Sequence, residues 1–121
     1  MKKILLVDDS QTVLLMEQMI LSKHRYEIFT AVNGEEAVQK AAAEHPDLIV
    51  MDVVMPKMDG FEACRAIRSQ ESTGRVPIIM VTTRGENTNV ETGFASGCSE
   101  YVTKPINSLE FLSKVLECLG E

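Results

Sequence analysis

The sequence predicts an α/β fold, a doubly wound parallel sheet of five strands in the order 2-1-3-4-5 with five flanking helices. Short apolar runs alternate with helix-like segments along the whole chain. Several runs are almost continuous in Ile, Leu, Val and Met, which is typical of strands buried on both faces of a parallel sheet. A chain of 121 residues suffices for one domain with a substantial core. We therefore expect a single domain over residues 1–121.

Five apolar segments are the expected strands. In chain order they are Lys3–Asp8, Tyr26–Ala31, Leu48–Asp52, Ile78–Thr82 and Glu100–Thr103. Each is followed by a segment with helical features, so consecutive strands should be joined by right-handed crossovers. The common solution for such a chain is flavodoxin-like, with ligands bound at the carboxyl ends of strands one and three.

Capping residues mark the beginnings of three helices. Asn33, Asp59 and Asn107 each stand three residues before a glutamate, a spacing that suits the first turn of a helix. The helix after Asn33 should end by His45, because Pro46 cannot continue it.

A helix from about Thr88 to Ser96 connects strands four and five. It is poor in strong helix formers and contains Gly93. We expect it to be the least stable helix and part of a surface that changes conformation.

The first helix has apolar residues on two sides. At roughly 100° per residue, Val13, Met16 and Ile20 form a stripe that we expect to face the sheet. Leu15 and Met19 then point away from it. Apolar residues on the outer side of a helix indicate either scattered surface residues or a surface for a partner or a second copy.

The composition argues against several classes of function. A net charge of −6 disfavours direct binding of nucleic acid, which usually requires a basic face. No apolar run is long enough to cross a bilayer, and the initial stretch leads into Asp8 without a signal-peptide cleavage site. Cys64, Cys98 and Cys118 lack metal-ligand spacing and are interpreted as reduced thiols. We expect a cytoplasmic protein with no direct nucleic-acid binding and no membrane insertion.

Acidic residues end two strands that the predicted sheet places side by side. Asp8 and Asp9 end the first strand, and Asp52 ends the third. Their carboxylates should therefore share one crevice. Like charges in a partly buried site are unfavourable unless a cation lies among them. Mg²⁺ is the expected cation, because it binds carboxylates, keeps several waters and favours phosphate partners.

A carboxylate beside such a cation can attack a phosphoryl group and form an acyl phosphate. Asp52 is the candidate nucleophile. The new phosphate would need a hydroxyl donor and a second cation, which Thr82 at the end of strand four and Lys104 just after strand five can supply. These residues all fall at the carboxyl ends of strands, where this fold binds its ligands.

The stretches ILLVDD, DLIVMDVVMP followed by DG, PIIMVTT and YVTKP occur in this order. They resemble the signature blocks of response regulator receiver domains, the CheY-like family of bacterial two-component signalling. The resemblance covers essentially the whole chain. It implies a phosphorylation-dependent switch that changes its partner-binding surface, and not an enzyme beyond its own phosphorylation and dephosphorylation.

The resemblance assigns roles around the acidic residues. Asp52 matches the aspartate that accepts the phosphoryl group. Asp9, Asp52 and the backbone carbonyl of Val54 match the ligands of Mg²⁺, and Asp8 matches a supporting carboxylate.

The resemblance also identifies the parts of the switch. Lys104 and Thr82 match the two groups that contact the phosphate. Pro105 is similar to the cis-proline of the family, and Tyr101 matches the switch aromatic, whose ring moves between outward and inward positions.

The resemblance also suggests a partner. In the family, the first-helix region meets the histidine-bearing helix of a histidine kinase or a histidine phosphotransfer protein. Leu15 and Met19 are therefore the expected partner surface.

Other interpretations remain open. A hydrolase with an aspartyl-phosphate intermediate typically has two aspartates separated by one residue, whereas Asp8 and Asp9 are adjacent. A flavin-binding module of the same topology would need a phosphate loop where this chain has DDSQTV. A third interpretation is a receiver fragment of a longer regulator with a separate output domain.

Overall fold

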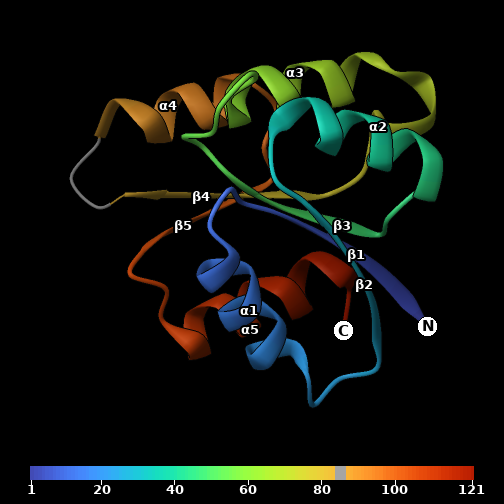
Figure 1. Cartoon of the computed structure of the whole chain (residues 1–121), viewed down its shortest axis with the longest axis vertical. Helices are drawn as coiled ribbons and strands as arrows, with labels where there is room; N and C mark the ends of the chain where they lie inside the picture. Colours follow the sequence, from blue (N-terminus) through green and yellow to red (C-terminus); the bar gives the residue numbers. More distant parts are fainter. Residues whose placement is uncertain (84–86) are drawn as a thin grey trace.

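The computed structural model describes residues 1–83 and 87–121, in which five strands form one sheet between two layers of helices (Figure 1). All neighbouring strands are parallel, in the order β2-β1-β3-β4-β5. The predicted fold class and strand order are therefore confirmed. The strands are β1 (Lys2–Val7), β2 (Tyr26–Ala31), β3 (Leu48–Asp52), β4 (Ile78–Thr83) and β5 (Glu100–Lys104).

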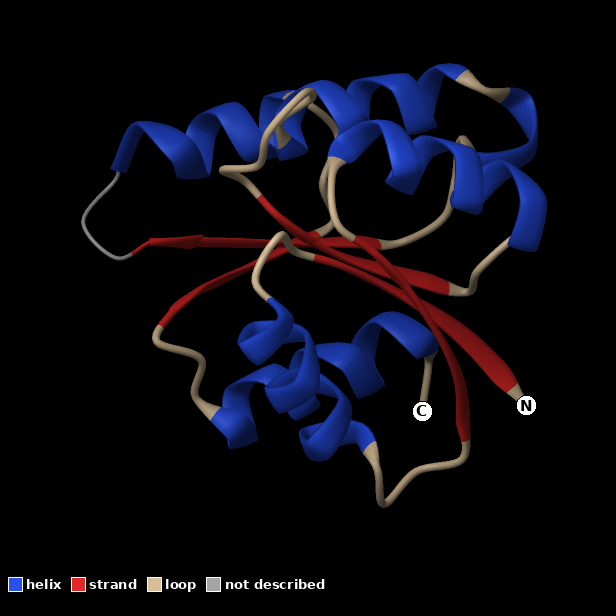
Figure 2. Ribbon diagram, in the orientation of Figure 1, coloured by secondary structure: helices blue, strands red, loops and turns tan. Residues whose placement is uncertain are grey.

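Helices follow the strands and cover both faces of the sheet. Figure 2 shows α1 and α5 on one face and α2, α3 and α4 on the other. In the described part of the chain, no helix has the length and apolar composition needed to span a membrane. The helices are α1 (Gln11–Leu21), α2 (Gly34–Glu44), α3 (Gly60–Ser69), α4 (Asn87–Ala95) and α5 (Ser108–Leu119), with a short 3-10 turn η1 (Glu71–Thr73) after α3.

The predicted capping residues begin their helices. The side chains of Asn33, Asp59 and Asn107 accept hydrogen bonds from the third backbone N–H after them, at 2.8, 2.9 and 3.0 Å. Helix α1 begins in the same way at Ser10, which accepts from the N–H of Val13 at 3.3 Å. Each cap satisfies a backbone donor that the first helical turn leaves free.

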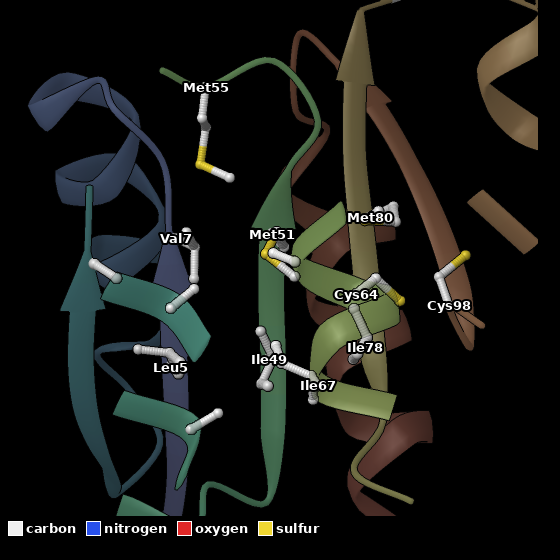
Figure 3. Packing of buried hydrophobic residues seen from close by; sticks show 14 residues of the cluster. Leu5, Val7, Ile49, Met51, Met55, Cys64, Ile67, Ile78, Met80 and Cys98 are labelled. Carbon is white, nitrogen blue, oxygen red and sulfur yellow. The ribbon is translucent and has the colours of Figure 1, made fainter. Parts of the chain in front are cut away.

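Two hydrophobic cores lie on opposite faces of the sheet, because successive strand residues point to opposite sides. The α1/α5 core consists of Ile4, Leu6, Leu14, Leu21, Leu48, Val50, Ile79, Val81, Val102, Phe111, Val115 and Leu119. The α2–α4 core, seen in Figure 3, consists of Leu5, Val7, Ala31, Ala37, Ala41, Ile49, Met51, Met55, Ala63, Cys64, Ile67, Ile78, Met80 and Cys98.

The inward face of α1 differs from the prediction. Its buried residues are Leu14, Glu17 and Leu21. The predicted stripe was wrong, because Met16 is 38% exposed and its two companions are only partly buried. Apolar spacing alone does not identify the buried face, because that face contains a glutamate, a residue type that is almost never fully buried.

Candidate functional site

The carboxyl ends of β1 and β3 bring three carboxylates together. Asp52 is the last residue of β3, and Asp8 and Asp9 directly follow β1, the parallel neighbour of β3. One oxygen from each of these three residues lies within 4.8 Å of the others. Asp8 and Asp52 are buried, whereas Asp9 is exposed, so the cluster opens to solvent at Asp9. We call these three aspartates together with Lys104 the acid pocket.

Asp8 is fixed on both sides. Its Oδ1 accepts the backbone N–H of Ser10 at 2.9 Å, and its Oδ2 accepts from Nζ of Lys104 at 3.2 Å. Its own backbone N–H donates to the carbonyl of Ala31, which continues the β1–β2 ladder one residue beyond the strand. With 1% of its surface exposed, Asp8 is a buried carboxyl group held by hydrogen bonds at both oxygens.

Lys104 supplies the positive charge of the pocket. Its Nζ lies 3.2 Å from Oδ2 of Asp8 and 3.2 Å from Oδ1 of Asp52. Burial alone would lower the pKa of Lys104, but the attraction of Asp52 and Asp8 outweighs it and raises the pKa overall. Lys104 is therefore charged. The peptide bond between Lys104 and Pro105 is cis, as expected from the sequence.

Asp52 is held in an environment that makes its ionised form less stable. Burial and the neighbouring charge of Asp8 raise its pKa to about 6, although Lys104 opposes this rise. At neutral pH Asp52 is still mostly a carboxylate. It is thus a buried anion whose charge is only partly compensated, a suitable state for a nucleophile or for a ligand of a further cation.

The donor set of the acid pocket fits a hard divalent cation. All three aspartates offer carboxylate oxygens, and the exposure of Asp9 leaves room for water ligands. Val54 lies two residues beyond Asp52, with a side chain that is 67% exposed at the same end of the sheet.

The loop from β3 to α3 is held against the pocket by close backbone contacts. The N–H of Gly60 donates to the carbonyl of Val53 at 2.8 Å. A Cβ atom at Gly60 would overlap the carbonyl oxygen of Asp52 and lie 2.9 Å from Cα of Val53. Gly60 therefore positions Asp52, a role that the sequence analysis missed although it noted the Asp-Gly pair.

Thr82 and Tyr101 lie on adjacent strands. Thr82 is 2% exposed and stands one residue after Val81, which pairs with Asp52 across β3 and β4. The ring of Tyr101 stacks on Phe94 with a centroid distance of 6.3 Å, and its hydroxyl oxygen is buried. The ring thus occupies an inward position in this structure.

Glu17 is a second residue that the sequence analysis missed. It is 1% exposed, and burial and the charge of Asp8 raise its pKa to about 8. The spacing of Leu14, Glu17 and Leu21 along one helix face could have indicated its burial. Its electrostatic coupling to the pocket was not visible in the sequence.

Helix α1 carries an apolar groove on its outer side, beside α5. Leu15 and Met19 are 59% and 66% exposed, as predicted, and Leu109 of α5 is 81% exposed. The groove has a volume of about 570 Å³ and is lined by Thr12, Leu15, Met16, Met19, Ile20, Lys23, Ser108, Leu109 and Leu112.

A family model matches almost the whole chain. Residues 4–116 match the model described as response regulator receiver domain. The chain is 41% identical to the alkaline phosphatase synthesis transcriptional regulatory protein PhoP of Bacillus subtilis, over 94% of this chain and 47% of that protein. It is 36% identical to the protein PilH of Pseudomonas aeruginosa, over 95% of both. The chain thus spans about half of the first relative and nearly all of the second.

A solved structure shows the same fold with a metal ion. The receiver domain of the sensor histidine kinase PA1611 from Pseudomonas aeruginosa superposes with a TM-score of 0.91 at 31% identity, covering 99% of this chain and 98% of that one. That structure has a magnesium ion coordinated in the active site cleft.

Proposed function

Because this chain belongs to the response regulator receiver domain family, we propose that it is a signalling switch and that the side chain of Asp52 accepts the phosphoryl group. The observation that carries this proposal is the gathering of the three carboxylates within 4.8 Å of one another. Asp52 pairs with Lys104, as Asp8 does, and burial is the main cause that raises the pKa of Asp52 to about 6.

The proposed cofactor is Mg²⁺, held by the carboxylates of Asp9 and Asp52 and the carbonyl of Val54, with Asp8 in support. When bound, the ion would neutralise the pocket and polarise the oxygens of the incoming phosphoryl group. The magnesium-containing receiver domain of PA1611 and the oxygen-rich donor set of this pocket support the choice.

The chemistry of the protein residues follows from their positions. A carboxylate oxygen of Asp52 forms a bond to phosphorus as the bond from phosphorus to the donor nitrogen breaks, and the electron pair of that bond stays with the donor. Lys104, 3.2 Å from Asp52, pairs with the added negative charge. Thr82 donates its hydroxyl to the phosphate. Water later attacks the phosphorus, the bond from phosphorus to the Asp52 oxygen breaks, and inorganic phosphate leaves while the carboxylate is restored.

The proposed switch couples Thr82 to Tyr101. The phosphoryl group adds about −1.5 to −2 charges and new acceptor oxygens. Thr82 moves toward these oxygens, and Tyr101 is stabilised in its inward position by the space that Thr82 leaves. The ring of Phe94, which stacks on Tyr101 and is 49% exposed, would be held in place with it and would fix the surface that a downstream protein meets.

The proposed partner is the histidine-bearing helix of a histidine kinase or histidine phosphotransfer protein. The apolar groove along α1 and α5 supports this partner, because an amphipathic helix lays its apolar face into such a groove. Replacing Leu15 and Met19 with aspartate should slow phosphorylation by the partner but leave phosphorylation by acetyl phosphate unchanged. Slowing of both reactions would count against docking at this groove.

The proposal covers the receiver domain over residues 1–121. It applies equally to a protein of the length of PilH and to the receiver part of a longer regulator, as in the relation to PhoP. We place the domain in the cytoplasm, without direct nucleic-acid binding, because the net charge of −6 disfavours a polyanionic partner.

Intact mass tests the proposed acceptor. After treatment with acetyl phosphate and Mg²⁺, the wild-type chain should gain the mass of one phosphoryl group, and Asp52→Asn should gain none. Asp59→Asn is a matched control, because asparagine also caps a helix and this residue lies outside the pocket. Equal phosphorylation of Asp52→Asn and the wild type would overturn the proposal.

A further inference from the structure

Glu17 is a buried carboxyl group for which the proposed mechanism has no use. It is 1% exposed and lies between Leu14 and Leu21 on the face of α1 that packs on the sheet. Its Oε1 is buried and has no hydrogen-bond partner among the described residues. A leucine would continue the apolar row, so packing gives no reason for a carboxyl group here.

The pocket lies directly beyond the core that contains Glu17. Ile4 and Leu6 of β1 point into the α1/α5 core, and alternation along the strand places Asp8 on the same side. By the same alternation, Asp52 follows Leu48 and Val50 of β3. The two carboxylates of the pocket therefore extend from the sheet toward the side where α1 lies.

Among the residues that the structure describes, the charges that act on Glu17 belong to the pocket. They are Asp8, directly after β1, and Asp52 of β3, which disfavour its ionised form, and Lys104 of β5, which favours it. Helix α1 also packs against β2 and α5, but no charged group of these elements acts on Glu17. No hydrogen bond or ion pair joins Glu17 to the pocket within residues 1–83 and 87–121, so the coupling acts through space.

We propose that Glu17 is a proton-carrying member of the acid pocket, which keeps its proton while the pocket is free of metal and releases it to solvent when a divalent cation is bound. The negative charge left on Glu17 then offsets part of the charge of the cation. This inference rests on the proposed cation site, and it adds a regulation by pH above neutrality, where Asp52 is already mostly ionised.

Glu17 differs from the other acids in the pH range where it titrates. Its pKa of about 8, raised mainly by burial, leaves it largely neutral at pH 7, whereas Asp52, with a pKa of about 6, is already mostly ionised there. Linkage is reciprocal, so a cation that favours the release of this proton is itself bound more tightly once the proton has gone. Cation affinity should therefore rise between pH 7 and pH 9.

Calorimetric titration with Mg²⁺ at pH 7 and pH 9 tests the inference. For the wild-type chain we expect the affinity to increase by about tenfold, a typical size for coupling between two sites. Glu17→Gln keeps a neutral polar side chain of the same shape and should show no such increase. Glu117→Gln removes an exposed carboxyl group from α5 and should behave like the wild type.

A wild-type affinity that is equal at both pH values, or an increase that persists in Glu17→Gln, would overturn the inference. Absence of Mg²⁺ binding at every pH would instead overturn the proposed function, so the two failures are distinguishable. A metal-free readout is the pH dependence of unfolding in EDTA. The wild type should lose stability between pH 6 and pH 8 relative to Glu17→Gln, because only its folded form keeps the Glu17 proton in that range.

Discussion

The two faces of the sheet serve different purposes. The α2–α4 face packs apolar side chains and cysteines, with small residues such as Ala37, Ala41 and Ala63. Its buried polar residues Thr73 and Ser96 are uncharged, and their hydroxyl groups donate hydrogen bonds to backbone carbonyls. The α1/α5 side combines an apolar core with the buried Glu17 and ends in the charges of Asp8 and Asp52. The α2–α4 face therefore contributes packing. The α1/α5 face also buries carboxyl groups, at a cost in free energy that a core made only of apolar side chains would avoid.

The packing face also fixes the geometry of the charged one. Gly60 at the start of α3 touches the backbone of Asp52, and the N–H of Gly34 at the start of α2 donates to the carbonyl of Met58 at 3.1 Å. Neither glycine has room for a Cβ atom. The backbone next to the pocket is thus held from the opposite side of the sheet.

The largest predicted effect is that of Gly60→Ala. The added methyl group must displace the backbone of Asp52, so we expect a loss of about 3 kcal/mol of unfolding free energy, at the upper end for overpacking. Urea unfolding measures it. Gly74→Ala is the control, because the nearest atoms to its Cβ would be 3.1 and 3.3 Å away, and it should lose less than about 1 kcal/mol. Equal losses would show that Asp52 is not held by this contact.

The second prediction concerns the buried carboxyl group of Glu17 on the α1/α5 face. Glu17→Leu should increase the unfolding free energy by about 1–3 kcal/mol, because an apolar side chain of similar size replaces a buried carboxyl group whose Oε1 has no hydrogen-bond partner in the described part of the chain. Glu117→Leu on the exposed side of α5 should change it by less than about 0.5 kcal/mol. A loss of stability in Glu17→Leu would mean that both faces are optimised for packing.

The third prediction concerns the pH dependence of the charged face without divalent cations. Burial, more than neighbouring charge, raises the pKa of Asp52 from 3.8 to about 6 and that of Glu17 from 4.5 to about 8. The folded chain therefore binds more protons than the unfolded chain between these values, and stability falls as the pH rises through them. The urea midpoint of the wild type should fall as the pH rises from 4 to 8. In Asp52→Asn the fall up to pH 6 should be smaller than in the wild type. A fall of equal size in the wild type and this variant would contradict the assignment.

The sequence predicted what depends on repeated local patterns. Buried parallel strands, the caps at Asn33, Asp59 and Asn107, and the placement of acids at strand ends all follow from spacing and side-chain type, and the structure contains each of them. The ends of β1, β4 and β5 differ by one residue from the predicted strands. At β1 the N–H of Asp8 still donates to the carbonyl of Ala31, one residue beyond the strand.

The features that the sequence did not predict depend on how helices and strands lie against one another in the fold. The burial of Glu17 follows from how α1 is rotated against the sheet, and apolar periodicity cannot predict a rotation that places a carboxyl group inside. The role of Gly60 depends on the approach of α3 to the end of β3. Both features depend on tertiary packing, and both lie beside the acid pocket. Functional sites are where natural sequences most often depart from the local patterns that predict a fold.

The smallest predicted effect has the opposite sign to that of Gly60→Ala, although both glycines lie on the same face. Gly93 is inside α4, and a Cβ there would lie 3.4 Å from Sγ of Cys98 and 3.4 Å from Cε2 of Tyr101, ordinary contact distances. Gly93→Ala should therefore stabilise the chain by about 0.5–1 kcal/mol, the usual gain when alanine replaces glycine within a helix.

The same methyl group would also contact the ring of Tyr101 in its inward position and favour that position. Amide exchange over Glu91–Ala95 should become slower in Gly93→Ala, while exchange in α5 stays unchanged. Slower exchange without a change in phosphorylation by acetyl phosphate would assign α4 to the response of the switch and not to its chemistry. A loss of stability would instead show that α4 has no room for the methyl group, and that both glycines of this face are required by close packing.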